Sequence, residues 1–236
     1  MFACWRRLGD ASLGSNLAQI GRLMPSRSLT EFQALLQHVE HLIETPGKIR
    51  TGRGRRFNQE AIHRAGTVMT IAAWQAYIEK VVIEAYSAIE ATLKDVEEEE
   101  APPPNWAINS FLVAKVQLKQ VVGRFSTPNV QNVRGIFDNH FGVDPTFDWY
   151  WRSGRRDWTA SDMCGWTDDW VKIRHTIAHG SNLPSNIDWI KGDNGVPRLT
   201  LWLLRDCKAH FEHIAKKTDT FFVRHLRQTY NAYLPQ

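Results

Sequence analysis

The sequence predicts an all-α protein, organised as a four-helix-type bundle with additional helices and allowing one short β-hairpin. Apolar residues recur at steps of three and four along most of the 236 residues, which is the spacing of one face of a helix. Capping residues, glycines and prolines divide these stretches into five or six segments of helical length. A chain of this size with 43% hydrophobic residues is long enough to bury a substantial core.

The chain is expected to contain one domain. Residues 1–27 are polar and weakly patterned, so we interpret them as a loosely ordered N-terminal extension, with Met24 as a candidate start of the folded unit. Residues 28–236 are expected to form a single helical domain. The three cysteines show neither a disulfide framework nor zinc spacing, which favours a reducing, cytoplasmic location and no metal or other cofactor. No apolar run approaches the length of a membrane span, so no membrane partner is expected.

Two long helices are predicted in the first hundred residues. The first is expected to begin after Ser28, where Ser28 and Glu31 have the spacing of a capping box, and to end at Pro46. The second is expected to run from Asn58 to about residue 97. The basic, glycine-rich stretch between them fits either a solvated connector or a loop that contacts RNA phosphates. Its candidate RNA-binding residues are Arg53, Arg55 and Arg56.

Two further helices and an aromatic segment follow. One helix is expected from Asn105 to about Arg124, and the next is expected to use Thr127 as its cap and to end at Gly142. Residues 144–158 interleave aromatic side chains with arginines. Such a segment either stacks bases and neutralises phosphates or fills the core with its aromatics while its arginines face water. Its candidate RNA-binding residues are Arg152, Arg155 and Arg156.

The central helix is predicted to end at Gly180, which suits the left-handed position that closes a helix. Thr159 and Ser161 are both candidate N-caps, so the helix has about 18 residues. Arg174 and His179 are expected in its last two turns. Its apolar face is predicted to consist of Trp166, Trp170, Ile173 and Ile177.

The C-terminal region is predicted to contain the hairpin and one more helix. Residues 187–190 and 199–202 flank a turn at Asp193, Asn194 and Gly195, which indicates a small hairpin. A last helix from Leu204 to Tyr230 is expected to pack along the central helix.

The segment from Arg174 to Gly180, reading Arg-His-Thr-Ile-Ala-His-Gly, resembles the ribonuclease signature of the HEPN superfamily. In that signature a polar residue follows the arginine, and a histidine lies near the helix C-terminus. Ala73 to Glu79 resembles the Trp-x-x-Tyr/Phe-x-x-Glu helix of several prokaryotic HEPN families, and residues 127–142 resemble a helix that precedes the signature. The resemblance covers residues 28–232.

The resemblance implies a HEPN-like domain that is a dimeric, metal-independent endoribonuclease. It further implies a toxin or abortive-infection effector of prokaryotic defence, with a possible antitoxin or other regulatory partner. Arg174 and His179 would be catalytic, His175 would orient this pair or contact the substrate, and Glu79 would orient Arg174 through an ion pair. The net charge of +4 permits an anionic partner such as RNA.

The residue types fit cleavage of RNA. The 2′-hydroxyl of RNA attacks the adjacent phosphate if one group removes its proton, another protonates the leaving 5′-oxygen and a cation stabilises the phosphorane. Histidine transfers protons near neutral pH, and arginine stays charged with a fork that matches phosphate oxygens. Because one histidine cannot easily be acid and base in one step, a homodimer that pairs two signatures is expected, with 2′,3′-cyclic phosphate and 5′-hydroxyl products.

Geometry and two other readings limit this hypothesis. Five residues advance about 140° around a helix, so Arg174 and His179 converge only if the arginine reaches along the helix, the last turn is distorted or a second copy faces the first. His175 and His179 have the spacing of two metal ligands on one helix face, but no third ligand is identifiable, so no metal is predicted.

The alternative functions are a non-catalytic HEPN module that binds RNA or protein, and a helical scaffold in which the motif is coincidental.

Overall fold

The computed structural model describes residues 24–49, 59–99, 105–153 and 156–235. This part of the chain is predominantly helical, which confirms the predicted all-α class. Two short 3-10 helices, η1 (Pro145–Asp148) and η2 (Asp188–Ile190), and an antiparallel hairpin of β1 (Trp151–Ser153) and β2 (Arg156–Trp158) accompany the helices. The α-helices are α1 (Arg27–Ile49), α2 (Glu60–Glu99), α3 (Asn105–Gly123), α4 (Val130–Phe141), α5 (Ala160–Ala178) and α6 (Leu201–Tyr230).

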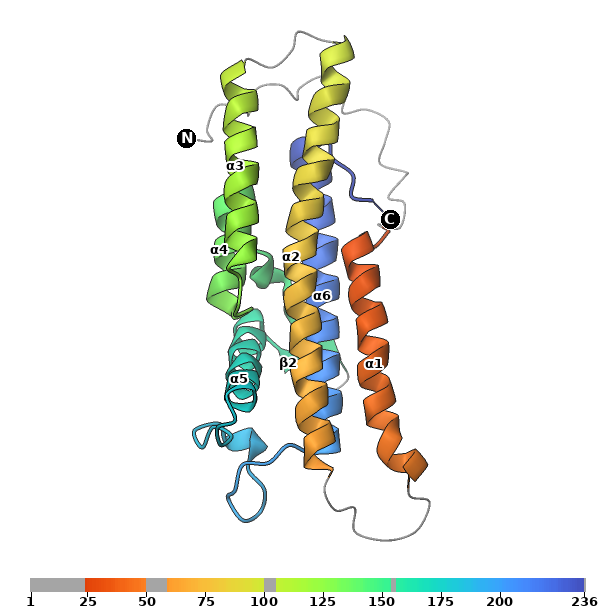
Figure 1. The fold of residues 1–236 in the computed structure, drawn as a ribbon, viewed down its shortest axis with the longest axis vertical. Helices are drawn as coiled ribbons and strands as arrows, with labels where there is room; N and C mark the ends of the chain where they lie inside the picture. The colour runs from red at the N-terminus through yellow and green to blue at the C-terminus, as the bar shows by residue number, and fades with distance from the viewer. Residues whose placement is uncertain (1–23, 50–58, 100–104, 154–155, 236) are drawn as a thin grey trace.

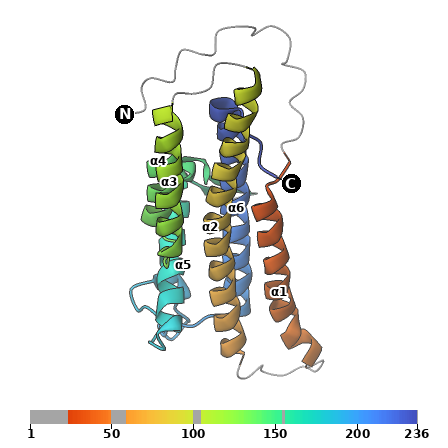
Figure 2. The same cartoon turned by 45° about the horizontal axis from the view of Figure 1, so that its top comes forward.

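The helices run side by side along the long axis of an elongated bundle (Figures 1 and 2). The 40-residue helix α2 is central and packs against α1, α6 and α5. Helices α3 and α4 flank the upper half of α2 in Figure 1, and α5 flanks the lower half. The C-terminal end of α5 therefore lies at the same end of the bundle as the N-terminal ends of α2 and α6. The last helix was predicted to pack along α5. Helix α6 instead packs chiefly on α2 and α1, and its contact with α5 is smaller.

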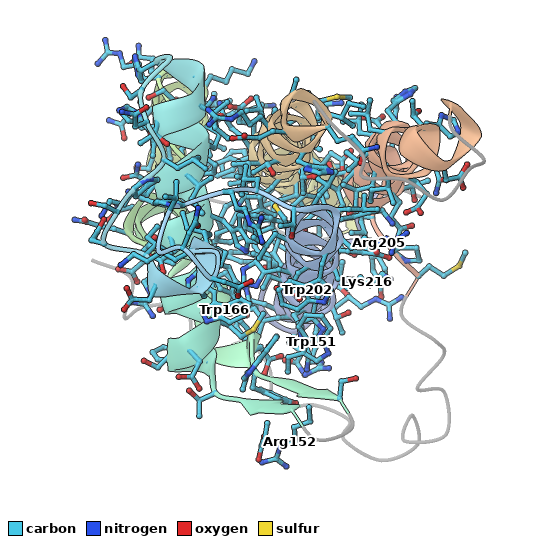
Figure 3. All side chains as sticks on the ribbon, turned by 90° about the horizontal axis from the view of Figure 1, so that it is seen from below. Trp151, Arg152, Trp166, Trp202, Arg205 and Lys216 are labelled. Carbon is cyan, nitrogen blue, oxygen red and sulfur yellow. The ribbon has the colours of Figure 1, made fainter. Side chains whose placement is uncertain are left out.

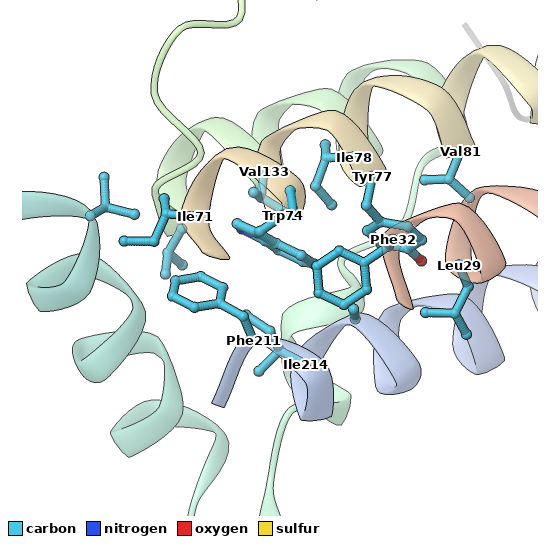
Figure 4. Close-up of a cluster of buried hydrophobic side chains, with 14 of the residues drawn as sticks. Leu29, Phe32, Ile71, Trp74, Tyr77, Ile78, Val81, Val133, Phe211 and Ile214 are labelled. Atoms are coloured by element: carbon cyan, nitrogen blue, oxygen red, sulfur yellow. The ribbon is translucent and has the colours of Figure 1, made fainter. Parts of the chain in front are cut away.

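The core is formed by aromatic and aliphatic side chains that meet around α2 (Figure 4). Trp74 is fully buried, lies 5.6 Å from Tyr77 between ring centroids and contacts Phe211 of α6 at 6.0 Å. Its Nε1 donates a hydrogen bond to the carbonyl of Pro128 at 3.3 Å, which ties α2 to the start of α4. Trp74 is thus a packing residue, because its ring is fully buried against other aromatic rings and its polar atom is hydrogen-bonded inside the protein.

Helix α1 begins earlier than predicted and is capped by a different serine. The hydroxyl of Ser26 accepts a hydrogen bond from the backbone N of Leu29 at 3.0 Å, which is the contact of an N-cap. The backbone N of Ser26 also donates to the buried carboxylate of Asp219 on α6 at 3.1 Å. The predicted capping box is not formed, because Ser28 lies inside the first turn and its backbone N donates to Glu84 at 3.3 Å. The packed region therefore extends upstream of Ser28.

Two other helix ends differ from the prediction. Helix α1 continues through Pro46 to Ile49 instead of stopping at Pro46. The cap of α4 is Asn129, whose side chain accepts from the backbone N of Asn132 at 2.8 Å, so Thr127 lies before the helix. The predicted end of α4 at Gly142 is confirmed by its left-handed φ of 68°.

The hairpin lies elsewhere in the chain than predicted. Residues 151–153 pair with residues 156–158 to form it, with Trp151 opposite Trp158. The segment predicted to be a hairpin contains η2 instead, and only the isolated bridge between Lys191 and Pro197 pairs its two sides. Residues 201 and 202 belong to α6, because Thr200 caps that helix by accepting from the backbone N of Leu203 at 3.2 Å.

Candidate functional site

Helix α5 carries the signature residues and begins at a complete capping box. The hydroxyl of Thr159 accepts from the backbone N of Asp162 at 3.2 Å, and the Asp162 carboxylate accepts from the backbone N of Thr159 at 2.9 Å. The Thr159 hydroxyl and backbone N together hold the pKa of Asp162 below its ordinary value. Of the two predicted caps, the structure therefore selects Thr159. The fully buried Trp170 and Ile173 fix the rotation of the helix against the core.

The end of α5 is a Schellman motif that fixes the position of His179. The backbone N of Ser181 donates to the carbonyl of Thr176 at 2.9 Å, and that of Gly180 donates to Ile177 at 3.1 Å. Gly180 has the predicted left-handed conformation, with a φ of 67°. Ala178 is the last helical residue, so His179 is the C-cap and lies one step beyond the helix in which it was predicted.

The structure brings the two signature histidines together. The rings of His175 and His179 have centroids 4.3 Å apart and planes inclined by 55°. Both side chains are exposed to solvent. Two imidazoles that can donate or accept protons therefore occupy one accessible surface at the end of α5.

Arg174 lies on a different side of the helix from the histidines. Its side chain is half-buried, and its Nε is shielded from solvent without a hydrogen-bond partner. No ion pair or hydrogen bond joins its guanidinium to any residue that the structure describes, His179 included. The arrangement leaves a cationic hydrogen-bond donor without an acceptor among the residues that the structure describes. Such a donor matches an oxyanion supplied from outside.

Glu79 does not contact Arg174 in this structure. Its carboxylate accepts a hydrogen bond from Nε2 of Gln75 at 2.9 Å, and the same amide nitrogen donates to the carbonyl of Phe125 at 2.7 Å. Glu79 also lies about 29 Å along α2 from its first residue, well away from the end of the bundle that holds the tip of α5. Within the described protomer it therefore helps to join α2 to the α3–α4 connection.

The predicted RNA-binding arginines lie partly outside and partly within the described residues. Arg53, Arg55, Arg56 and Arg155 lie outside the described residues. Arg156 is described only as part of β2, where it pairs with Ser153. Arg152 is exposed and forms an ion pair with Asp157 at 3.0 Å.

The described part of the aromatic segment at residues 144–158 divides its rings between the core and the surface. Trp149 is fully buried and donates from Nε1 to the hydroxyl of Thr218 at 2.9 Å, so it fills the core. Phe147 and Tyr150 are exposed, with 73% and 45% of their surfaces accessible. Trp151 is half-buried. The segment thus anchors itself in the core through one ring and presents others to solvent.

A buried histidine that the sequence did not single out lies at the same end of the bundle as the signature. Nδ1 of His63 donates to the carbonyl of Leu199 at 3.0 Å, and its Nε2 is buried without a partner. The bond joins the first turn of α2 to the residue pair before α6. Its sequence signal was a lone polar residue on the apolar face of α2, which more often marks packing than chemistry.

Within the described residues, no group of three or more His, Cys, Asp or Glu side chains has an arrangement that would hold a metal ion. Within the same residues, no helix combines the length and the apolar character needed to span a membrane.

Comparison with known proteins identifies a family for the greater part of the chain. A family model described as RiboL-PSP-HEPN matches residues 26–196. The match begins at the residue that caps α1 and includes Arg174, His175 and His179. No curated protein and no solved structure matches the chain.

Proposed function

We propose that this chain, which belongs to the RiboL-PSP-HEPN family, is a metal-independent endoribonuclease whose catalytic residues are Arg174 and His179. Family membership supports a ribonuclease or RNA-related role in general. The observation that carries the specific proposal is the state of Arg174, whose guanidinium lacks an acceptor among the described residues and whose Nε is withheld from water. The exposed imidazoles of His175 and His179 lie at the same end of the helix.

In this proposal the reaction is an internal transesterification of RNA. One imidazole removes the proton from a 2′-hydroxyl, and the 2′-oxygen forms a bond to the adjacent phosphorus. The phosphorus–O5′ bond then breaks, and a protonated imidazole gives its proton to the departing 5′-oxygen. The products are a 2′,3′-cyclic phosphate and a 5′-hydroxyl, so neither water nor a metal takes part in this step. Arg174 stabilises the extra negative charge of the phosphorane through its fixed fork of donors.

The acid and the base have two possible sources. A second copy of the chain would supply another His179 and would bring its own Arg174 to the same phosphate, as the HEPN resemblance implies. Alternatively, His175 supplies the second imidazole within one protomer, because its ring already lies against that of His179. We propose the homodimer as the active form, since Arg174 and His179 of one protomer do not bond to each other.

The test is cleavage of an end-labelled RNA pool in EDTA by the wild-type chain, with analysis of the new ends. Cyclic phosphate and 5′-hydroxyl ends are expected. Arg174→Ala and His179→Ala are each expected to reduce the rate by at least about 10²-fold, the usual size of a proton-transfer or oxyanion contribution. Lys119→Glu, at an exposed position on α3, is the matched control. Undiminished cleavage by both signature variants contradicts the proposal.

We further propose that the nuclease acts as a toxin or abortive-infection effector, held in check by an antitoxin or another regulatory partner. The support is the HEPN resemblance. Induced synthesis of the chain in a bacterium is expected to arrest growth and to degrade cellular RNA, and the His179→Ala variant is expected to do neither. RNA binding without cleavage under any condition would favour the alternative, a non-catalytic HEPN module.

A further inference from the structure

We infer that single-stranded RNA binds along one side of the bundle, on a surface built from α6, α5 and the β1–β2 hairpin. This inference rests on the proposed function, because it names the RNA form that the same site would receive. Figure 3 shows the side chains that gather on this side, with the hairpin projecting beyond α6. We call them the aromatic–basic strip, and its members are Trp151, Arg152, Trp166, Trp202, Arg205 and Lys216.

The strip contains aromatic rings that the fold holds at fixed positions. Trp151 stacks on His213 of α6 with centroids 4.5 Å apart and planes 8° from parallel. Trp158 lies between Trp151, at 5.4 Å, and Trp166 of α5, at 4.7 Å. Because His213 and Trp158 hold Trp151 in place, little conformational freedom is lost when a base stacks on the exposed part of its ring. Trp166 is enclosed by Trp158, Trp189 and His210, so it supports this cluster.

Helix α6 adds the most exposed ring and two cations. Trp202, Arg205 and Lys216 fall within about 60° of one another around the helix, at 100° per residue. They therefore form one outward row about 21 Å long. Trp202 has 56% of its surface accessible, so more than half of this side chain is open to a stacking base.

The charges of the strip are available to phosphates. Arg205 forms no ion pair with any residue in the described part of the chain. Arg152 pairs with Asp157 at 3.0 Å and Lys216 pairs with Glu212 at 2.7 Å, but both cations are more than half exposed. Exposed ion pairs of this kind contribute little free energy, so a phosphate competes with the carboxylate at small cost.

This composition favours RNA over a protein partner. Sequence-tolerant binding of single strands combines a basic track with aromatic platforms for unstacked bases. Lysine is depleted at the centres of protein interfaces, whereas the strip includes Lys216. A duplex keeps its bases stacked inside the helix and so offers nothing to Trp202. A single strand is therefore the occupant that uses both kinds of side chain.

The strip also leads toward the signature. Trp202 lies in the first turn of α6, at the end of the bundle where α5 terminates (Figure 1). Trp166 lies on α5 itself, eight residues before Arg174 and thus about 12 Å along the helix. A strand bound along α6 would accordingly reach the end of the bundle that presents Arg174 and His179.

The test is fluorescence anisotropy of a labelled 15-nucleotide single-stranded RNA, and of the same sequence as a duplex, with full-length His179→Ala protein in EDTA. Adding Trp202→Ala is expected to weaken single-strand binding about 5- to 150-fold, the loss of one stacked base, and Trp202→Phe is expected to retain most of the affinity. Adding Arg205→Glu is expected to weaken binding and to reduce its salt dependence. Tyr233→Ala, at a 61% exposed aromatic residue outside the strip, and Lys119→Glu are the matched controls. Melting temperatures verify that each variant is folded.

The outcomes separate this inference from the proposed function. Cleavage that depends on the signature, combined with normal RNA affinity of the Trp202 and Arg205 variants, overturns the strip and leaves the nuclease. Affinity that depends on the strip, combined with no cleavage by wild type, supports the strip and contradicts the nuclease. Equal affinity for single strand and duplex overturns the stacking role. Absence of any RNA binding overturns the strip, and combined with no cleavage by wild type it overturns the proposed function as well.

Discussion

The imidazole rings of His175 and His179 lie with their centroids 4.3 Å apart, one helical turn from each other at the end of α5. Arg174 precedes His175 directly but faces another side of the helix. Within one protomer the signature thus separates its two imidazoles from its guanidinium. A phosphate that contacts both must either bridge the tip of the helix or lie between two copies.

We expect the two histidines to differ in their importance for cleavage. If His175 orients the pair, His175→Ala should lower the single-turnover cleavage rate about 10- to 100-fold, the loss of one hydrogen bond to a charged group. His175→Asn should recover part of the rate, since asparagine also donates and accepts hydrogen bonds at this position. A wild-type rate for His175→Ala would assign the whole proton transfer to His179 and its symmetry mate.

Gly180→Ala is expected to destabilise the end of α5 and to impair cleavage. The substitution forces an L-residue into the left-handed region, at a cost of about 1–2 kcal/mol, although an added Cβ would meet no atom within 4 Å. Gly165→Ala is the control, because Gly165 is inside the same helix and also has open space around it. That change is expected to stabilise the protein by about 0.5–1 kcal/mol. Urea unfolding and cleavage rates measure both effects, and equal stabilities of the two variants would argue against the Schellman end.

Thr159→Ala is expected to cost about 1 kcal/mol of stability through loss of the N-cap of α5. Ser161→Ala, two residues later and exposed, is expected to stay within about 0.5 kcal/mol of wild type. The stabilisation from the box requires ionised Asp162, whose pKa is lowered, so it is present above the ordinary pKa and is lost as the pH falls through the lowered value. Chemical unfolding at pH 7 and pH 3 tests this, and a larger loss for Ser161→Ala would reassign the cap.

Stability is expected to fall in mild acid because His210 is buried in its neutral form. Burial lowers its pKa from 6.5 to about 3, and its Nε2 bonds to the hydroxyl of Thr167 at 2.8 Å. In the unfolded chain this histidine binds a proton below pH 6.5, whereas in the folded chain it stays neutral down to about pH 3. Between these pH values the free energy of unfolding therefore falls by about 1.4 kcal/mol for each pH unit.

His210→Gln is expected to reduce the slope of stability against pH between 6.5 and 4.5 by up to one proton. Burial also lowers the pKa of His140, His213 and His225, so part of the slope remains. Urea unfolding at several pH values provides the measurement, with His38→Gln at an exposed position as the substitution control. An unchanged slope in His210→Gln would contradict the burial of a neutral imidazole.

The sequence predicted local features of α5 well because their causes lie within a few residues. Thr159 and Asp162 cap each other, and Gly180 supplies the backbone conformation that ends the helix. The helix bounds therefore followed from short-range chemistry, together with the apolar stripe through Trp170. The sequence placed His179 in the last turns of the helix, whereas the structure makes it the C-cap, one residue beyond the helix.

Features that depend on distant partners were not predictable in the same way. Ser26 rather than Ser28 caps α1 because Asp219, nearly two hundred residues away, receives the backbone N of Ser26. The hairpin packs its Trp151 ring on His213 of α6, a contact that the local sequence does not reveal. The outward placement of Trp202 likewise depends on which side of α6 the core occupies. Periodicity indicates that a helix has an apolar side but does not identify the neighbour that covers it.

The Nε of Arg174, which has no hydrogen-bond partner among the described residues, affects the stability of the folded protein. A buried donor without an acceptor weakens the native state by roughly 1–3 kcal/mol, a burden that an apolar side chain of similar length would remove. Arg174→Met should therefore give a more stable protein without cleavage activity. Binding of an oxyanion at Arg174 should raise the melting temperature of the wild type. Stability and activity would then oppose each other at a single nitrogen atom.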